Sequence, residues 1–375
     1  MYATLSYLLL AVSLSSADGM KDIVCVDGER ACLLRSVFTH GKTVSFQACS
    51  PPMVGLSAFV PVVFSVKGPL YLPSTFNLVA NESCDSSYVG GPHYPVHVIF
   101  EPFYMPNVGH AMGDDIFPIF RALRLFGFHA HPRITVLTVQ PLSSYPSRVL
   151  EMYELLHLRV QDYEDDWYPN MITGIAGLSY HEPLPFGTGG VLDDFRDWVY
   201  ARARITTNDL HQPVFTLIGK DYDVAGHPNG MANPAAVEQW IKNMYPQSTV
   251  RHIMLTKVSF AQQLNIFHST DVLIGAPGSD LMTAIFLKNK RVLLIIPEVF
   301  KLVGQNGTCD LSLGHEYDGW FQHRGSVQMV TYPVVYPNET VKQIQRGDGP
   351  EFWYRVVVDE LRFADALRVA VNALN

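Results

Sequence analysis

The alternation of apolar runs with helix-like segments in the second half of the chain constrains the fold most. Runs rich in β-branched and aliphatic residues predict strands at 213–219, 250–255, 272–274 and 291–296. Helix-like stretches lie between them at 234–245, 260–268 and 281–287. Asn233 is a good N-cap for the first of these helices. This β-α-β-α-β-α-β order is typical of a doubly wound parallel sheet.

The first half repeats the pattern over a shorter length. Expected strands at 96–100 and 134–139 flank an expected helix at 116–128, which indicates a βαβ unit. A loop-rich connector with a helix at 195–205 follows, and an amphipathic helix at 359–374 ends the chain. We therefore expect α/β domains at 18–210 and 211–345 and a C-terminal helical segment at 346–375.

Composition agrees with this organisation and excludes several classes of protein. The 375 residues suffice for about two domains at roughly 100–200 residues each, and 48% of them are apolar. A net charge of −8 argues against a nucleic-acid partner. After the N-terminus no apolar run approaches the ~20 residues that span a bilayer, so we expect no stable membrane span.

The N-terminus predicts entry into the secretory pathway. Residues 1–17 resemble a signal peptide, with an apolar run at 5–14 and small residues at Ser15 and Ala17. No Lys or Arg precedes that run, and an uncleaved anchor or a buried helix are the alternatives. We expect a protein of the endoplasmic reticulum or Golgi lumen, or a secreted one. N-glycosylation sequons begin at Asn81, Asn306 and Asn338.

Cysteine spacing favours disulfides over a zinc module. Four of the five cysteines lie within the first 84 residues, at Cys25, Cys32, Cys49 and Cys84. In an oxidising lumen they could form up to two disulfides, whose pairing the sequence does not reveal. No CxxC spacing is present.

The turn at 274–280 is the first candidate binding element. It joins an expected buried strand to an expected helix, where Gly275 and Gly278 would let the backbone approach a phosphate. Ser279 could donate to a phosphate oxygen or simply cap the helix. A plain strand-to-helix turn is therefore the alternative interpretation.

The segment 107–115 is the second candidate. A histidine with two carboxylates at +4 and +5, His110 with Asp114 and Asp115, could act as a general base with an orienting acid, or bind a metal. Asp115 could equally be an N-terminal helix charge. His129 and His131 could bind a metal or act as cations at a helix C-terminus. The motifs of serine hydrolases and zincins are absent from the sequence.

Two segments together resemble glycosyltransferase family 61. These are FYMPNVGHAMGDDIFPIFRALRLF at 103–126 and DVLIGAPGSDLMTAIFL at 271–287, and the likeness runs from about residue 95 to 300. The resemblance implies a GT-B architecture, in which two Rossmann-like domains face each other across a cleft. It implies an inverting transferase whose second domain binds a nucleotide-sugar, expected to be a UDP-sugar. The first domain would present a hydroxyl of a glycan or glycoprotein.

The resemblance also assigns site residues by position. His110, Asp114 and Asp115 match the catalytic polar cluster, and His110 would be the base. The residues expected to bind the donor are Lys220, Gly275, Gly278, Ser279, Asp280 and Thr283. No metal or other cofactor is expected to be required, with Mg²⁺ or Mn²⁺ at the acidic pair as the alternative.

The chain departs from the family pattern on the donor side. Pro277 replaces the histidine of the turn, Val224 lies near the place of an arginine, and Leu294 replaces an acid. Pro has neither an N–H nor an imidazole to offer a ligand. A catalytically weak relative that binds a glycan or nucleotide-sugar is therefore the second hypothesis, and a luminal hydrolase or unrelated α/β protein is the third.

Overall fold

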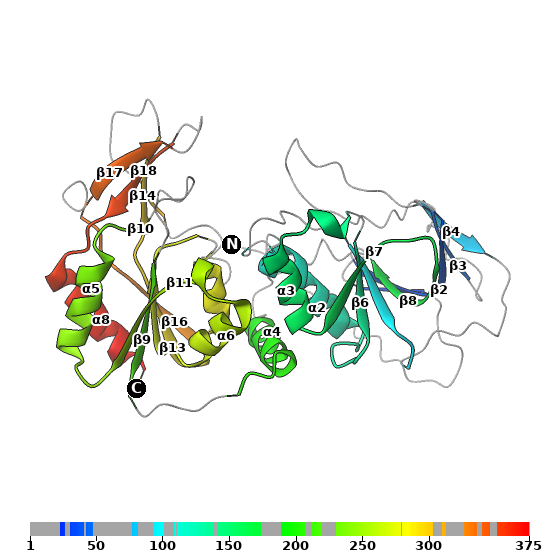
Figure 1. The fold of residues 1–375 in the computed structure, drawn as a ribbon, viewed down its shortest axis with the longest axis horizontal. Coiled ribbons are helices and arrows are strands. Elements are labelled where there is room, and N and C mark those ends of the chain that lie inside the picture. Colours follow the sequence, from blue (N-terminus) through cyan, green and yellow to red (C-terminus); the bar gives the residue numbers. More distant parts are fainter. Residues whose placement is uncertain are drawn as a thin grey trace, which may run out of the picture.

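The computed structural model contains one parallel and two mixed sheets with helices packed against them (Figure 1). The structure describes residues 23–26, 31–40, 43–47, 77–81, 93–100, 109, 111–138, 141–173, 189–206, 212–219, 230–278, 280–302, 310–312, 326–335, 340–345 and 351–374. Its α/β character agrees with the sequence-based expectation.

The first sheet has eight strands in the order β4-β3-β2-β8-β5-β6-β7, with β1 paired to β2. Its strands are β1 Ile23–Val26, β2 Ala31–His40, β3 Thr43–Gln47, β4 Asn77–Asn81, β5 Val96–Phe100, β6 Ile134–Thr138, β7 Leu158–Asp162 and β8 Trp167–Thr173. The block β8-β5-β6-β7 is parallel throughout. The predicted strand at 96–100 has the predicted bounds, and the βαβ unit is confirmed.

The helices of the first half are η2 Ala111–Ile116, α2 Phe117–Leu125, η3 Leu142–Ser144, α3 Ser147–Leu155 and α4 Gly189–Arg202. The helix predicted at 116–128 ends three residues early. Gly127 adopts a φ of 76°, which suits the residue after a helix. Its N–H donates to Arg124 O, and the Phe128 N–H donates to Leu123 O. These two bonds satisfy the last carbonyls and stop α2.

The second sheet is fully parallel, in the order β11-β9-β12-β13-β16. Its strands are β9 Val214–Gly219, β11 Thr249–Met254, β12 Val272–Gly275, β13 Arg291–Ile295 and β16 Val327–Thr331. The accompanying helices are α5 Pro234–Met244, η5 Leu255–Lys257, α6 Phe260–His268 and η6 Leu281–Phe286. The predicted doubly wound pattern is confirmed, with β16 as an additional strand.

A small sheet stands at one end of the second sheet (Figure 1). It contains β10 Gly230–Met231, β14 Glu298–Leu302, β15 Asp310–Ser312, β17 Thr340–Gln345 and β18 Glu351–Val356. Because β18 pairs with β14 and β17, the expectation of a purely helical segment at 346–375 is wrong. The helix itself is α8 Glu360–Asn372, close to the predicted bounds.

Two local predictions need correction. Asn233 makes no cap hydrogen bond to α5. Its amide donates to Val358 O at 2.9 Å and accepts from Val358 N at 2.8 Å, so it clamps the chain before α8 instead. The helix predicted at 195–205 begins at Gly189 and ends at Arg202.

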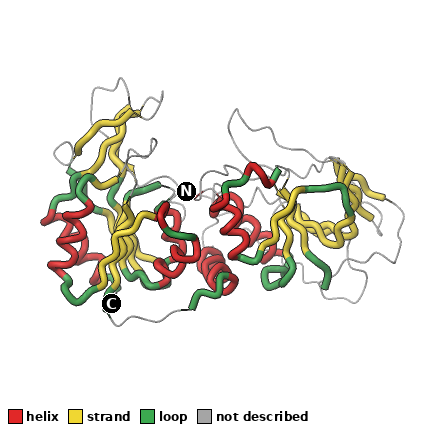
Figure 2. Tube along the Cα trace, viewed as in Figure 1, coloured by secondary structure: helices red, strands yellow, loops and turns green. Residues whose placement is uncertain are grey.

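One apolar core joins the two halves of the chain. Helices α2, α3, α4 and α6 lie between the first and second sheets, as Figure 2 shows. Phe195 of α4, Phe120 of α2 and Phe286 of η6 belong to the same cluster of buried side chains. A second cluster fills the other face of the second sheet, where α5 and α8 pack.

Several expectations about entry into the secretory pathway concern residues outside those that the structure describes. The signal peptide at 1–17 and the sequons at Asn306 and Asn338 lie there. Cys25 and Cys32 are register partners of the antiparallel strands β1 and β2. In the part of the chain that the structure describes, no helix has the length and apolarity needed to cross a bilayer.

Candidate functional site

The second sheet has a topological switch point between β9 and β12. After β9 the chain forms β11, which pairs with one edge of β9, and then β12, which pairs with the other edge of β9. In sheets of this order, ligands bind in the crevice outside the carboxyl ends of the two strands at the switch point. Those ends are Gly219 and Gly275, the residues next to which the sequence places the donor-binding segment.

The turn after β12 depends on two glycines. A Cβ on Gly275 would lie 2.9 Å from Leu281 Cδ1, so an added side chain would displace Leu281. The distance of 3.5 Å to Ile218 Cβ is an ordinary van der Waals contact. Gly278 has a φ of 135°, a backbone conformation that L side chains rarely adopt. Its carbonyl accepts from Leu281 N at 2.9 Å. The turn therefore needs a glycine at position 275 because of the close packing and a glycine at position 278 because of the positive φ.

The segment after this turn is not the α-helix predicted at 281–287. It is the six-residue 3-10 helix η6, and all of its residues are buried. A short 3-10 helix aligns few peptide dipoles, so it offers an anion less than the expected α-helix would. Thr283 is 3% exposed and its hydroxyl donates to Asp280 O at 2.5 Å, which closes the first turn of η6.

A histidine that sequence reasoning missed lies beside the end of β9. A Cβ on Gly219 would be 2.7 Å from the Nε2 atom of His252, so the imidazole lies against the bare backbone of that glycine. The Nδ1 atom of His252 lies 3.3 Å from a carboxylate oxygen of Glu238. Lys242 donates to Glu238 at 2.6 Å and holds the pKa of that carboxyl below its ordinary value, as His252 also does more weakly.

The first sheet has its own switch point, between β5 and β8. The chain moves from β5 through β6 to β7, and β8 then pairs with the other side of β5. The acidic pair follows β5 at this point, on the π-helix η2 at Ala111–Ile116. Pro118 lies just beyond it in α2 and has no N–H, so regular α-helical bonding cannot run back through this turn. Single π-turns of this kind are frequent at functional sites.

Both carboxylates of the pair are buried. Asp114 is 8% exposed and Asp115 is 1% exposed. Tyr153 of α3 is fully buried, and burial raises the pKa of its phenol well above the ordinary value, with the charge of Asp115 and the nearby Tyr145 adding to the effect. The acidic pair therefore belongs to the interior of the first half and not to its surface.

Helix α4 links the segments that follow the two motifs. The ring of Phe195 lies 5.2 Å from Phe117 in α2 and 6.2 Å from Phe286 in η6. Tyr200 donates a hydrogen bond to Phe286 O, and Arg196 donates to Asn289 at 2.5 Å. The two candidate segments are therefore supported by one helix, although they are far apart in the sequence.

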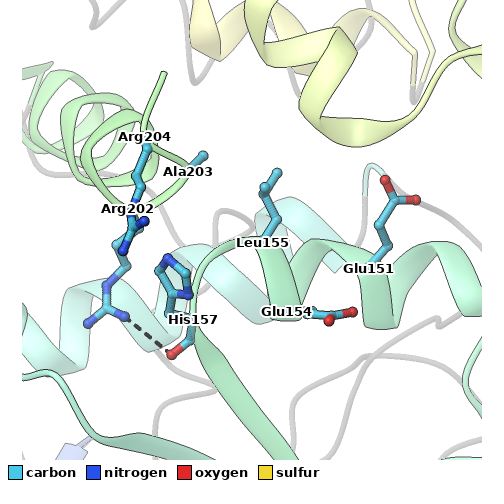
Figure 3. A pocket seen from close by; sticks show the side chains of 7 residues that line it. All are labelled: Glu151, Glu154, Leu155, His157, Arg202, Ala203 and Arg204. Atoms are coloured by element: carbon cyan, nitrogen blue, oxygen red, sulfur yellow. Dashed lines mark hydrogen bonds between the residues drawn. The ribbon is translucent and has the colours of Figure 1, made fainter. Parts of the chain in front are cut away.

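A cavity of about 380 Å³ has no residue of either motif in its lining (Figure 3). It is lined by Glu151, Glu154, Leu155, His157, Arg202, Ala203 and Arg204. His157 directly precedes β7, so the cavity lies at the amino end of that strand, opposite the edge where ligands bind in parallel sheets. Arg202 donates to Leu156 O at 2.9 Å and so caps α3. We assign this cavity no part in the site.

Three expected site residues lie outside the described residues. They are His110, Lys220 and Ser279. His110 lies between the described residues Gly109 and Ala111, Lys220 follows Gly219, and Ser279 lies between Gly278 and Asp280. Among the described residues no group of three or more His, Cys, Asp and Glu side chains is arranged to hold a metal ion. The Nδ1 atom of His131 is 3.0 Å from Arg133 O, and the carbonyl of His129 accepts from Trp198.

Comparison with known proteins identifies the family. The model of the family Glycosyltransferase 61 matches residues 97–294, which is more than half of the chain and runs from β5 to β13. A comparison with curated proteins finds no match. The matched region contains both motifs, both switch points and helix α4, and the chain therefore belongs to the glycosyltransferase 61 family.

Proposed function

We propose that the chain is an inverting glycosyltransferase that moves a sugar from a UDP-sugar to a hydroxyl of a glycan or glycoprotein. One observation carries the proposal: in each half of the chain the family motif lies at the carboxyl end of a strand next to the switch point of a block of parallel strands. Nucleotides bind at such points. In the proposed GT-B arrangement the second sheet holds the donor and the first presents the acceptor.

The donor site is proposed at the ends of β9 and β12. Gly275 lets the turn pack closely on Leu281, and the backbone at Gly278 is proposed to let a diphosphate approach closely. Ser279, Asp280 and Thr283 lie in the segment that follows and are proposed to contribute to the same site. Because η6 is short, its dipole supplies little positive potential. Lys220, directly after Gly219, is therefore proposed to carry most of the charge that stabilises the leaving diphosphate.

The transfer is proposed to be a single displacement. His110 takes the proton from the acceptor hydroxyl, whose oxygen forms a bond to C1 of the sugar. The bond from C1 to the diphosphate oxygen breaks, and its electron pair leaves with the UDP. Asp114 and Asp115 are proposed to orient the base, and no metal or other cofactor is proposed to be required.

We propose that the protein acts in the lumen of the secretory pathway or is secreted. The signal peptide at 1–17 and the sequons at Asn81, Asn306 and Asn338 support this. Expression in animal cells, followed by endoglycosidase treatment, tests it. The expected result is a faster-migrating band after treatment and a mature chain that begins near Asp18.

The donor site is tested by calorimetry with UDP on the mature protein, with and without Mn²⁺. We expect micromolar binding in both conditions, weakened at least tenfold in Lys220→Ala. The exposed Lys257 in η5 provides a matched control, and Lys257→Ala should bind UDP like the wild type. A screen of UDP-sugars for release of UDP then identifies the donor. Failure to bind UDP in either condition contradicts the proposal.

A catalytically weak relative that binds a nucleotide-sugar or glycan is the second candidate. Two residues favour it: Pro277 has no N–H to offer in the turn, and Leu294 is fully buried on β13, where the family resemblance leads us to expect an acid. Binding of a UDP-sugar without any transfer or release of UDP would support this candidate over the first.

A further inference from the structure

Tyr153 in α3 has a buried hydroxyl that the fold does not use. The residue is 0% exposed, and its hydroxyl has no hydrogen-bond partner within the described part of the chain. Buried polar groups are nearly always paired, and an unpaired one reduces stability. A phenylalanine would fill the same space without that loss, so packing alone does not account for a tyrosine here.

One carboxylate of the first motif, that of Asp115, acts electrostatically on the buried phenol of Tyr153. Tyr153 belongs to the same apolar cluster as Met112 and Ile116, which flank Asp114 and Asp115 on η2. The charge of Asp115 acts on the phenol and, together with burial, raises its pKa well above the ordinary value. The hydroxyl therefore keeps its proton at neutral pH and acts as a neutral donor or acceptor.

We propose that Tyr153 is a positioning residue for the transfer reaction, and that its hydroxyl donates to the carboxylate of Asp115 when the substrates are bound. This inference rests on the proposed function. Catalytic hydrogen bonds are often long or absent in the free enzyme and shorten in its complexes. A carboxylate that is held by the Tyr153 hydroxyl would in turn hold the segment that carries His110 in the orientation needed for proton transfer.

This role predicts that removal of the Tyr153 hydroxyl lowers the activity of the enzyme without lowering its stability. Removal of an unpaired buried hydroxyl leaves stability unchanged or improves it. Loss of an oriented donor at a catalytic group lowers the rate of the chemical step but leaves the binding of the donor sugar intact. A residue that only packs would show neither the loss of rate nor the split between kcat and KM.

The test compares Tyr153→Phe with Tyr332→Phe. Tyr332 is also 0% exposed, but its hydroxyl accepts from Asp359 N at 2.9 Å. With the UDP-sugar found in the donor screen, we expect Tyr153→Phe to lower kcat at least tenfold, to leave the KM for the donor within twofold, and to melt at or above the wild-type temperature. We expect Tyr332→Phe to melt at a lower temperature with kcat within twofold.

The outcomes separate this inference from the proposed function. Wild-type kcat in Tyr153→Phe, or a loss of kcat accompanied by a lower melting temperature and a raised KM, overturns the positioning role alone. A wild-type protein that neither binds UDP nor transfers a sugar overturns the proposed function, and the inference falls with it.

Discussion

The imidazole of His252 occupies the space that a side chain on Gly219 would need. Its Nε2 atom lies 2.7 Å from the position of a Cβ on that glycine, and Glu238 holds its other nitrogen at 3.3 Å. Gly219 ends β9 at the switch point of the second sheet and directly precedes Lys220. The packing of a histidine from the edge strand β11 is thus coupled to the place where the donor is proposed to bind.

Gly219→Ala should destabilise the protein by about 1–3 kcal/mol, since the added methyl displaces a held imidazole. It should also weaken the binding of UDP. In a His252→Ala background the same substitution should cost much less, because the clash is gone. Urea denaturation of the four proteins measures this coupling. Gly190 has no atom near its Cβ position, and Gly190→Ala serves as the control, expected to stabilise by up to about 1 kcal/mol. Additive effects of the first two substitutions would contradict the packing argument.

Phe195→Ala should destabilise the protein by about 3–5 kcal/mol, as expected for a fully buried aromatic residue. Because its ring contacts both Phe117 and Phe286, we expect the two halves to unfold together in one transition in the wild type. In the variant the transition should split or broaden in calorimetry. Leu361 is 76% exposed, and Leu361→Ala should stay within about 0.5 kcal/mol of the wild type. Two separate transitions in the wild type would refute a shared core.

Asn233→Ala should cost about 1–3 kcal/mol, because both backbone groups of Val358 lose their partner. Urea denaturation measures the loss. Asn243 provides the matched control: it is exposed, and its side chain accepts from Gln239 one turn away, so Asn243→Ala should have an effect below about 0.5 kcal/mol. Equal effects of the two substitutions would show that the clamp on the chain before α8 contributes nothing.

His97 should make stability depend on pH near neutrality. Burial lowers the pKa of this imidazole below its ordinary value of 6.5, against a weaker opposing effect of the carbonyl of Asn170. As pH falls through 6.5, the unfolded chain takes up a proton that the folded protein does not, so the free energy of unfolding decreases. We expect this loss between pH 7.5 and 5.5 in the wild type and a smaller loss in His97→Gln. Parallel stability curves for the two proteins would rule the effect out.

The repeated α/β units could be predicted from the sequence because their signals are local. The strand β5 and the helix α6 have the predicted bounds, and the ends of the other predicted strands differ by at most one residue. Strands β1 to β4, β7, β8 and β16 were not predicted. Ser259 caps α6 and pairs reciprocally with Gln262, so its start depends on neighbours in the chain. The small sheet gave no comparable signal, because β10 has two residues and pairs with β18 more than a hundred positions later.

The sequence by itself determined the α/β class, the order of the parallel strands along the chain and the two segments that place the protein in its family. Hydrophobic periodicity, glycine positions and capping residues act over a few neighbours, so these features can be read along the chain. Only the tertiary structure decided that Asp114 and Asp115 are buried, that Asn233 binds Val358 and that η6 is a short 3-10 helix. It also brought the charge of Asp115 to bear on the buried phenol of Tyr153 and placed His252 against Gly219. These relationships depend on how side chains from distant segments fill one interior, which no local pattern records.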